Sequence, residues 1–205
     1  MAKVKVATDW LDVCSGCHMS LLDIDERIVE LVKHVQFTSS PITDLKHPPE
    51  DGVDIGILTG AVSNTHQEET AKEMRERCKI LIAIGDCAVF GGICTMRNFF
   101  DKEDVLRRGY VETESTDEEG KVPRSDELGK LLDRVKAVNE VVKVDVHIPG
   151  CPPPADAIWF ALTELLAGRI PVLTGDNLTY EEGTVGDFQN LNDSQNFGYH
   201  RRSKA

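Results

Sequence analysis

The sequence contains no long apolar run, and no stretch approaches the roughly 18 continuous apolar residues of a membrane-spanning helix. It also lacks a basic excess, because 35 Asp and Glu oppose 23 Lys and Arg and give a net charge of −12. With no Lys/Arg-rich run either, the composition argues against a nucleic-acid surface. The first seven residues are typical of a charged strand rather than a signal peptide or a twin-arginine leader, so we expect a cytoplasmic protein.

At 205 residues and 40% hydrophobic content, the chain is long enough for one substantial core and too short for two large domains. Hydrophobic periodicity predicts helices that alternate with strands. The strands are expected at 4–10, 37–41, 53–58, 79–84 and 144–148, and the helices at about 21–35, 66–77, 125–138 and 155–167. This alternation predicts an α/β fold with a mainly parallel sheet covered by helices on both faces.

Two segments do not fit the alternation. Residues 101–124 are acidic and polar and lack an apolar period, so we expect an exposed insertion that is either a mobile loop or a partner-contact loop. Residues from Ile170 to the end have few periodic apolar side chains. A tail that cannot build its own core either frays or lies on a partner.

Six cysteines in a chain of this kind indicate metal binding or catalysis rather than a disulfide framework. Cys14 and Cys17 form a Cys-x-x-Cys pair where the first strand gives way to a helix, a pattern that also suits a thioredoxin-like redox motif or half a zinc site. Cys87 and Cys151 each follow a later strand. Because the carboxyl ends of parallel strands share one edge of the sheet, we expect these four thiolates to meet there.

A cage of four thiolates suits either structural zinc or an iron–sulfur cluster. Structural zinc sites usually close locally, whereas Cys87 and Cys151 each come more than sixty residues after the preceding ligand. This spacing favours a cluster on a preformed scaffold and leaves zinc open as the alternative. We expect Cys78 and Cys94, which lie in more apolar surroundings, to be inert small hydrophobes.

Three motifs together resemble the small subunit of nickel–iron hydrogenases, most closely the cytoplasmic, bidirectional NAD-reducing type. They are Trp10-Leu11-x-x-Cys14-Ser15-Gly16-Cys17-His18-Met19-Ser20, Gly85-Asp86-Cys87-Ala88-Val89-Phe90-Gly91-Gly92 and Pro149-Gly150-Cys151-Pro152-Pro153. The resemblance covers about residues 4–168. It implies that residues 1–168 form a flavodoxin-like domain and that residues 169–205 form an extended tail packed on a partner subunit. The implied ligands of one proximal [4Fe–4S] cluster are Cys14, Cys17, Cys87 and Cys151.

Departures from the wider family narrow the interpretation. Periplasmic relatives carry a second, cysteine-rich domain with two further clusters, and this sequence has none, so we expect one cluster only. Residues 59–61 read Thr-Gly-Ala where many respiratory small subunits have a glutamate before the glycine. The related subunit of respiratory complex I has adjacent cysteines at the first position, and the spacing of Cys14 and Cys17 argues against that relative. F420-reducing and sulfur-reducing hydrogenases remain alternatives.

The resemblance implies reversible oxidation of H2 coupled to reduction of NAD+. It places the nickel–iron centre in a separate large subunit, and flavin with further iron–sulfur clusters in diaphorase subunits. We therefore expect no catalytic residue here; the chain would relay electrons between those partners, with NADP or F420 as alternative acceptors. The Phe90-Gly91-Gly92 turn and the Thr59 loop are expected to pack against the large subunit, which would leave the free chain with exposed apolar surface.

Two other interpretations of the site remain open. A flavodoxin-like fold also suits a flavin-binding module, but the loop that would cradle the FMN phosphate holds Cys14 and Cys17, so FMN is the less favoured cofactor. The other interpretation is a zinc-stabilised scaffold subunit. Beside the ligands, His18 is either a hydrogen-bond partner of the cluster or a surface or interface histidine. For Asp86 a helix cap is the favoured role over a proton relay.

Overall fold

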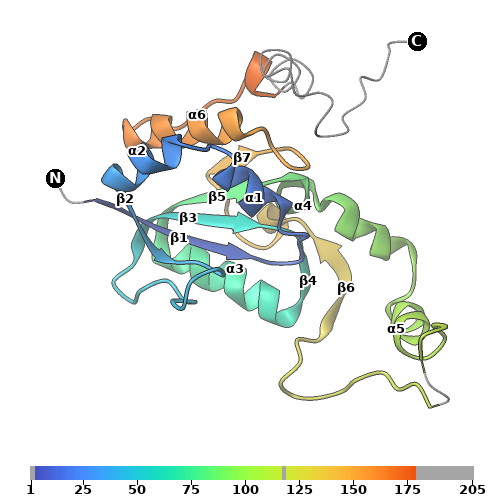
Figure 1. Cartoon of the computed structure of the whole chain (residues 1–205). Helices are drawn as coiled ribbons and strands as arrows, with labels where there is room; N and C mark the ends of the chain where they lie inside the picture. Colours follow the sequence, from blue (N-terminus) through green and yellow to red (C-terminus); the bar gives the residue numbers. More distant parts are fainter. Residues whose placement is uncertain (1–2, 117–118, 179–205) are drawn as a thin grey trace, which may run out of the picture.

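The computed structural model describes residues 3–116 and 119–178, and its centre is a five-stranded sheet in the order β2-β1-β3-β5-β7 (Figure 1). The strands are β1 (Val4–Trp10), β2 (Val35–Ser39), β3 (Val53–Thr59), β5 (Cys78–Ile84) and β7 (Val146–Ile148). Every neighbouring pair in this sheet is parallel. The order is that of a flavodoxin-like doubly wound sheet, so the predicted fold class is confirmed.

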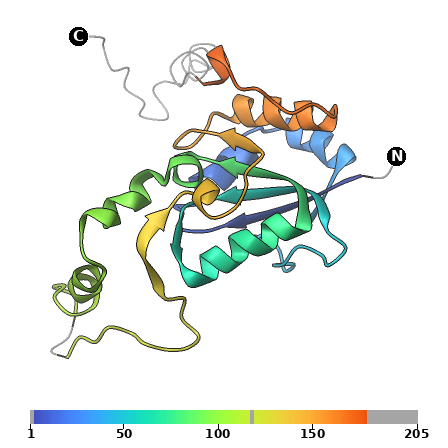
Figure 2. The ribbon, with the colours of Figure 1, turned by 180° about the vertical axis from the view of Figure 1, so that it is seen from behind.

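Helices cover both faces of the sheet (Figures 1 and 2). On one face the core joins Val6, Ile57 and Ile82 to the helices α1 (Gly16–Leu22), α2 (Arg27–His34) and α6 (Ala155–Leu166). On the other face it joins Ala7 and Leu81 to the helices α3 (Thr65–Arg77) and α4 (Asp86–Phe90). These apolar strands are buried from both sides, as parallel strands between helices should be. Within the described ranges, no helix has the length and apolar character needed to cross a membrane.

The helix predicted over residues 21–35 is two helices, α1 and α2. Asp25 adopts a φ of 55°, a left-handed conformation that an α-helix cannot contain, and the chain turns there. Leu21, Ile24 and Leu31 nevertheless all reach the same core cluster. The spacing of the apolar residues therefore predicted correctly which side chains are buried, but it did not predict that the helix is interrupted at Asp25.

The helix predicted over residues 125–138 is wrong. This segment forms the strand β6 (Leu131–Lys136), which pairs antiparallel with β4 (Val62–Asn64), and then a single 3-10 turn, η2 (Val138–Glu140). On the other side of β6, the Asn98 carboxamide accepts the Val135 N–H at 2.7 Å and donates to the Val135 carbonyl at 3.0 Å. The apolar residues are spaced as in a helix, but the hydrogen bonds on both sides of the segment hold it as a strand.

The segment after α4 projects from the sheet as an arm (Figure 1). It contains the 3-10 helix η1 (Gly92–Phe99) and the helix α5 (Lys102–Tyr110), and neither helix buries a residue. The predicted exposure of residues 101–124 is thus confirmed for its described part, whereas the expected lack of regular structure is wrong for α5. Asp101 caps α5 by accepting the Glu103 N–H at 2.9 Å.

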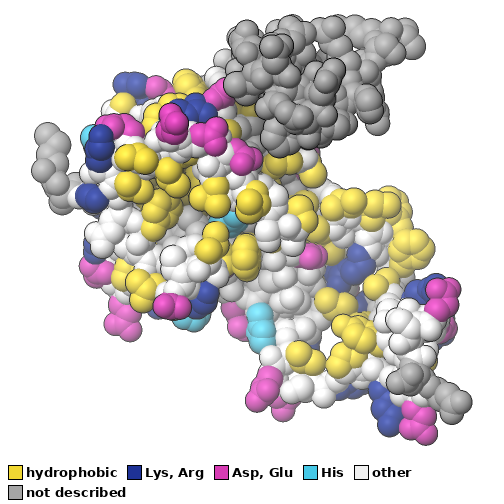
Figure 3. Space-filling model, viewed as in Figure 1, with side chains coloured by type: hydrophobic (Ala, Val, Ile, Leu, Met, Phe, Trp, Pro, Cys, Tyr) yellow, Lys and Arg dark blue, Asp and Glu magenta, His cyan; other side chains and the backbone are white. Residues whose placement is uncertain are grey.

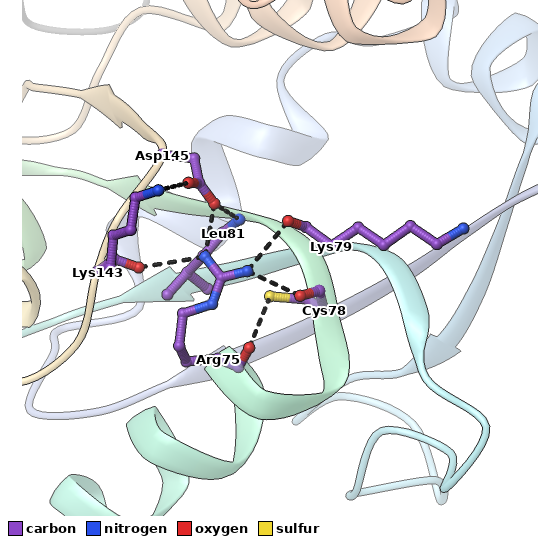
Figure 4. A network of polar contacts seen from close by, with 6 residues as sticks. All are labelled: Arg75, Cys78, Lys79, Leu81, Lys143 and Asp145. Atoms are coloured by element: carbon purple, nitrogen blue, oxygen red, sulfur yellow. Dashed lines mark hydrogen bonds and ion pairs between the residues drawn. The ribbon is translucent and has the colours of Figure 1, made fainter.

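A polar network holds strand β5 against the end of α3, on the side of the sheet where β5 begins (Figure 4). Arg75 donates to the Asp145 carboxylate at 2.5 Å and to the Cys78 carbonyl at 2.8 Å, while Asp145 accepts the Leu81 N–H at 2.9 Å. Burial alone would raise the pKa of Asp145, but the Leu81 amide and the Arg75 guanidinium together lower it below its usual value. The network joins the end of α3, strand β5 and the segment before β7.

The predicted boundary at residue 168 falls where α6 has just ended. Beyond it, Leu173 packs back against the core beside α6, while Ile170 and Val172 are exposed. The short 3-10 helix η3 (Gly175–Asn177) follows. Residues 179–205, which make up most of the predicted tail, lie outside the described residues.

Candidate metal centre

The four predicted ligands all lie at the carboxyl edge of the sheet. Cys14 is exposed in the loop after β1, and Cys17 is buried in the first turn of α1. Cys87 is half-buried in α4, directly after β5, and Cys151 is exposed in the loop after β7. All four are free thiols. They come from the three segments that follow β1, β5 and β7, each a loop with the first turn of a helix where one begins, which we call the cysteine loops. The structure thus brings together the side chains that the strand pattern predicted to meet.

The thiols are close enough to act on one another electrostatically. Burial raises the pKa of Cys17 to about 12, and the charges of Cys87, Cys14 and Cys151 add to that effect. Burial also raises the pKa of Cys151, with further contributions from Cys87, Asp86 and Cys14. Removing the protons from all of these thiols would therefore gather like charges in one place.

Two glycines leave room for two of the sulfurs because they carry no side chain. Gly85 has a φ of 92°, and a Cβ built on it would lie 2.2 Å from Cys17 Sγ. Gly92 has a φ of 49°, and its Cβ would lie 2.9 Å from Cys87 Sγ. A side chain at either position would displace a thiol, so the backbone itself forms part of the wall around the sulfurs.

Hydrogen bonds tie the cysteine loops together. The buried Ser20 of α1 donates to the Pro153 carbonyl at 2.5 Å, which joins the helix after Cys17 to the loop after Cys151. The Asp86 carboxylate accepts the Gly150 N–H at 2.7 Å, and the Asp86 N–H donates to the Gly150 carbonyl at 2.8 Å. No side chain caps α4, whose N-cap position is Gly85, so the predicted capping role of Asp86 is wrong.

His18 is buried, with 4% of its surface exposed, so a free surface histidine is excluded in this chain. Its Nδ1 lies 3.1 Å from Thr59 Oγ1, and its ring meets the edge of Trp10 at a centroid distance of 5.6 Å. Burial lowers the pKa of His18, so the imidazole is held neutral. Nε2 is buried and has no hydrogen-bond partner among residues 3–116 and 119–178.

Cys94 lies beside the site, where the sequence suggested only an apolar position. Its thiol donates to the Asp12 carbonyl at 3.3 Å, and burial, Asp12 and Cys87 together raise its pKa to about 12. In the sequence, the Gly91-Gly92 pair was the one indication that Cys94 lies near the site. Both glycines have a positive φ, and the turn that they form carries the chain back toward Cys87. Cys78 is buried at the start of β5, as expected for an inert cysteine.

The donor set fits an iron–sulfur cluster. Four thiolates without nitrogen or oxygen ligands are the usual ligands of a [4Fe–4S] centre, in which each iron takes one of them. Structural zinc would need all four sulfurs about 2.3 Å from a single point. Among the residues that the structure describes, no group of three or more His, Cys, Asp or Glu forms a ready-made site for a single metal ion. Zinc could use the same four sulfurs, so the choice between zinc and a cluster rests on the spacing of the cysteines in the sequence.

An apolar stripe continues from the cysteine edge onto the arm. Figure 3 shows hydrophobic side chains exposed over the segment between α4 and α5. The stripe consists of Phe90, Ile93, Met96, Phe99 and Phe100, each at least 59% exposed. A contiguous apolar surface of this kind usually marks a protein–protein contact.

Comparison with known proteins gives a consistent result. Residues 14–165 match the family described as NADH ubiquinone oxidoreductase, 20 Kd subunit. The chain is 43% identical over 169 residues to the delta subunit of the NAD-reducing hydrogenase HoxS of Cupriavidus necator, covering 82% of this chain and 80% of that protein. In a crystal structure of an NAD+-reducing [NiFe]-hydrogenase in the H2-reduced state, one chain matches with a TM-score of 0.84 and 38% identity, covering 88% of this chain and 100% of that chain.

A second kind of relative has a similar level of identity. The chain is 40% identical over 178 residues to one of the subunits of an F420-non-reducing hydrogenase of Methanothermobacter thermautotrophicus. This match covers 86% of the present chain but only 58% of that protein, so the chain spans little more than half of its length. F420-non-reducing hydrogenases were not among the alternatives that the motifs suggested.

Proposed function

The chain belongs to the family of the NADH ubiquinone oxidoreductase 20 Kd subunit and, within it, to the nickel–iron hydrogenase small subunits, and from this we propose that it is the electron-transfer subunit of an NAD-reducing hydrogenase. The overall reaction would be H2 + NAD+ = H+ + NADH. The nickel–iron centre would belong to a large partner subunit, and flavin with further clusters to diaphorase subunits. We place the complex in the cytoplasm.

The observation that carries the proposal is the convergence of four thiols from three loops on one edge of the sheet. Cys14, Cys17, Cys87 and Cys151 would each bind one iron of a single [4Fe–4S] cluster. The cluster would supply reversible one-electron transfer. The protein would hold it through the four sulfurs and limit its exposure to water on the side of the buried Cys17.

The exposure pattern suggests how the site meets its partner. Cys14 and Cys151 are the exposed pair of the four, so this side of the site would face the large subunit. The apolar stripe begins three residues after Cys87 and would extend the contact along the arm. The stripe is thus our candidate for the surface that the large subunit covers.

The choice of electron acceptor rests on the relatives, of which one is named for NAD reduction and another only as F420-non-reducing. The 43% identity to an NAD-reducing hydrogenase subunit over four-fifths of both chains favours NAD+. The 40% identity to an F420-non-reducing hydrogenase subunit favours, as the second candidate, a complex with a different electron partner. In both cases this subunit would have the same task.

The cluster is tested by iron and acid-labile sulfide analysis of the chain, prepared without oxygen and co-expressed with its partner subunits. We expect about four irons and four sulfides per chain. The Cys151→Ser variant should lose this iron and sulfide. Cys94→Ala is the matched control, because Cys94 lies next to Cys87 but is not a proposed ligand. Stoichiometric zinc without sulfide would overturn the electron-transfer assignment.

The acceptor is tested separately, by H2-dependent reduction catalysed by the purified complex. NAD+, NADP+ and F420 are offered in parallel at equal concentration. Reduction of NAD+ in preference to the other two is the expected result. An intact cluster combined with no reduction of NAD+ would reject the NAD assignment while leaving the electron-transfer role in place.

A further inference from the structure

Asp86 links two of the cysteine loops by a reciprocal pair of hydrogen bonds. It directly precedes Cys87, and its bonding partner Gly150 directly precedes Cys151. The Asp86 carboxylate accepts the Gly150 N–H at 2.7 Å, while the Asp86 N–H donates to the Gly150 carbonyl at 2.8 Å. Asp86 therefore extends the β5–β7 pairing, in which the Gly85 N–H donates to the Ile148 carbonyl at 2.8 Å, by one more link between the backbone segments that carry two of the four sulfurs.

The same carboxylate places a negative charge beside the thiols. Asp86 is half-buried, and its charge acts on both Cys17 and Cys151. Among the ion pairs of residues 3–116 and 119–178, none involves Asp86, so no Lys, Arg or His neutralises it at short range. A charge in this position acts through partly buried protein rather than through water alone.

We propose that Asp86 is a positioning residue of the cluster with two separable effects: its hydrogen bond to Gly150 holds Cys151 in place, and its charge lowers the reduction potential of the cluster. This inference rests on the proposed function. A cluster gains negative charge when it is reduced, so a fixed negative charge nearby disfavours the reduced form. A loop freed from its anchor, in contrast, binds its metal more weakly without a defined change in potential.

Two substitutions separate the two effects. In Asp86→Asn, the amide oxygen still accepts the Gly150 N–H, but the charge is gone. In Asp86→Ala, both the charge and the acceptor are lost. Asp51→Asn is the control for charge alone, because Asp51 lies just before β3, at the opposite end of strands about seven residues or roughly 23 Å long.

The experiment uses the co-expressed complex and measures iron, acid-labile sulfide and the reduction potential of the cluster by a redox titration followed by electron paramagnetic resonance. We expect Asp86→Asn to keep its iron and sulfide and to raise the potential by the equivalent of about a tenfold change in the one-electron equilibrium, or about 59 mV. Asp86→Ala should lose iron and sulfide relative to Asp86→Asn. Asp51→Asn should leave both quantities unchanged.

The outcomes distinguish this inference from the proposed function. If Cys151→Ser does not lower the iron and sulfide content of the complex, this chain holds no cluster, and the proposed function fails before Asp86 is considered. If the cluster is present and Asp86→Asn has the potential of the unmodified protein, the charge effect is refuted. If Asp86→Ala keeps its full content of iron and sulfide, the anchoring effect is refuted.

Discussion

Gly85→Ala is expected to be far more damaging than the removal of a single glycine usually is. Gly85 has a φ of 92°, and an added Cβ would lie 2.2 Å from Cys17 Sγ. With a ψ of 155°, this backbone conformation is one that essentially only glycine adopts, and it costs an L-residue about 1–3 kcal/mol. Forcing a methyl group into a filled space costs about 1–3 kcal/mol more. The free energy of unfolding should therefore fall by roughly 2–6 kcal/mol, the sum of the two terms.

Two other glycines separate these terms. Gly168 has a φ of 75° but nothing within 4 Å of its added Cβ, so Gly168→Ala carries only the backbone cost of about 1–2 kcal/mol. Gly109, within α5, has neither a positive φ nor a neighbour within 4 Å, so alanine there should stabilise the chain by about 0.5–1 kcal/mol.

The assay is urea unfolding of the full chain, followed by the fluorescence of Trp10 and Trp159, with iron analysis of the co-expressed complex for the same variants. The expected order of stability is Gly109→Ala, unmodified chain, Gly168→Ala and then Gly85→Ala. Only the Gly85 variant should also lose iron. Equal losses of stability for Gly85→Ala and Gly168→Ala, or a full complement of iron in Gly85→Ala, would show that the contact with Cys17 does not constrain the site.

Two further predictions concern parts of the chain outside the cysteine loops. The pKa of Asp145 is lowered in the folded state, so its contribution to stability is complete well above the unfolded pKa of about 3.9 and is lost as the pH falls through the lower folded-state pKa. The difference in urea midpoint between the unmodified chain and Asp145→Asn should be constant from pH 7 to pH 5 and shrink in more acidic solution, and a difference at pH 3 as large as that at pH 7 would contradict this. Phe99 is 82% exposed, so Phe99→Ser should change the free energy of unfolding by less than about 0.5 kcal/mol but reduce co-purification of the large subunit, whereas Val29→Ser, at a 61% exposed position on α2, should not; equal losses in both variants would mean that the apolar stripe is not the contact.

Local pattern was sufficient to place the four cysteines, for a reason that lies in the topology of parallel sheets. Each of the three loops follows a strand whose apolar residues are visible in the sequence, and parallel strands necessarily bring their carboxyl ends to one edge. Strands β1, β5 and β7 were therefore predictable together with the loops after them. The assignment of the four sulfurs to one cluster remains a prediction, because it depends on chemistry that the fold alone does not supply.

Features that depend on distant partners were not predictable. Residues 125–138 carry apolar side chains at helical spacing, yet β6 is held by β4 on one side and by Asn98 on the other. Asp86 resembles a capping residue from its place at the start of a helix, and only the fold brings Gly150 to its carboxylate. The burial of His18, in helix α1, likewise depends on Trp10 and Thr59, which end strands β1 and β3.

The three cysteine loops also impose an order of events during synthesis. Cys14 and Cys17 follow the first strand of the sheet, whereas Cys151 follows the last, β7, which joins at the edge by pairing with β5. At about 5–20 residues per second, a ribosome needs roughly 7–27 s to make the chain between them. Throughout that interval the thiols of Cys14 and Cys17 are present without that of Cys151. The proposed cluster would therefore have its full set of four ligands only after Cys151 has been made, so its assembly would come late in synthesis or after it.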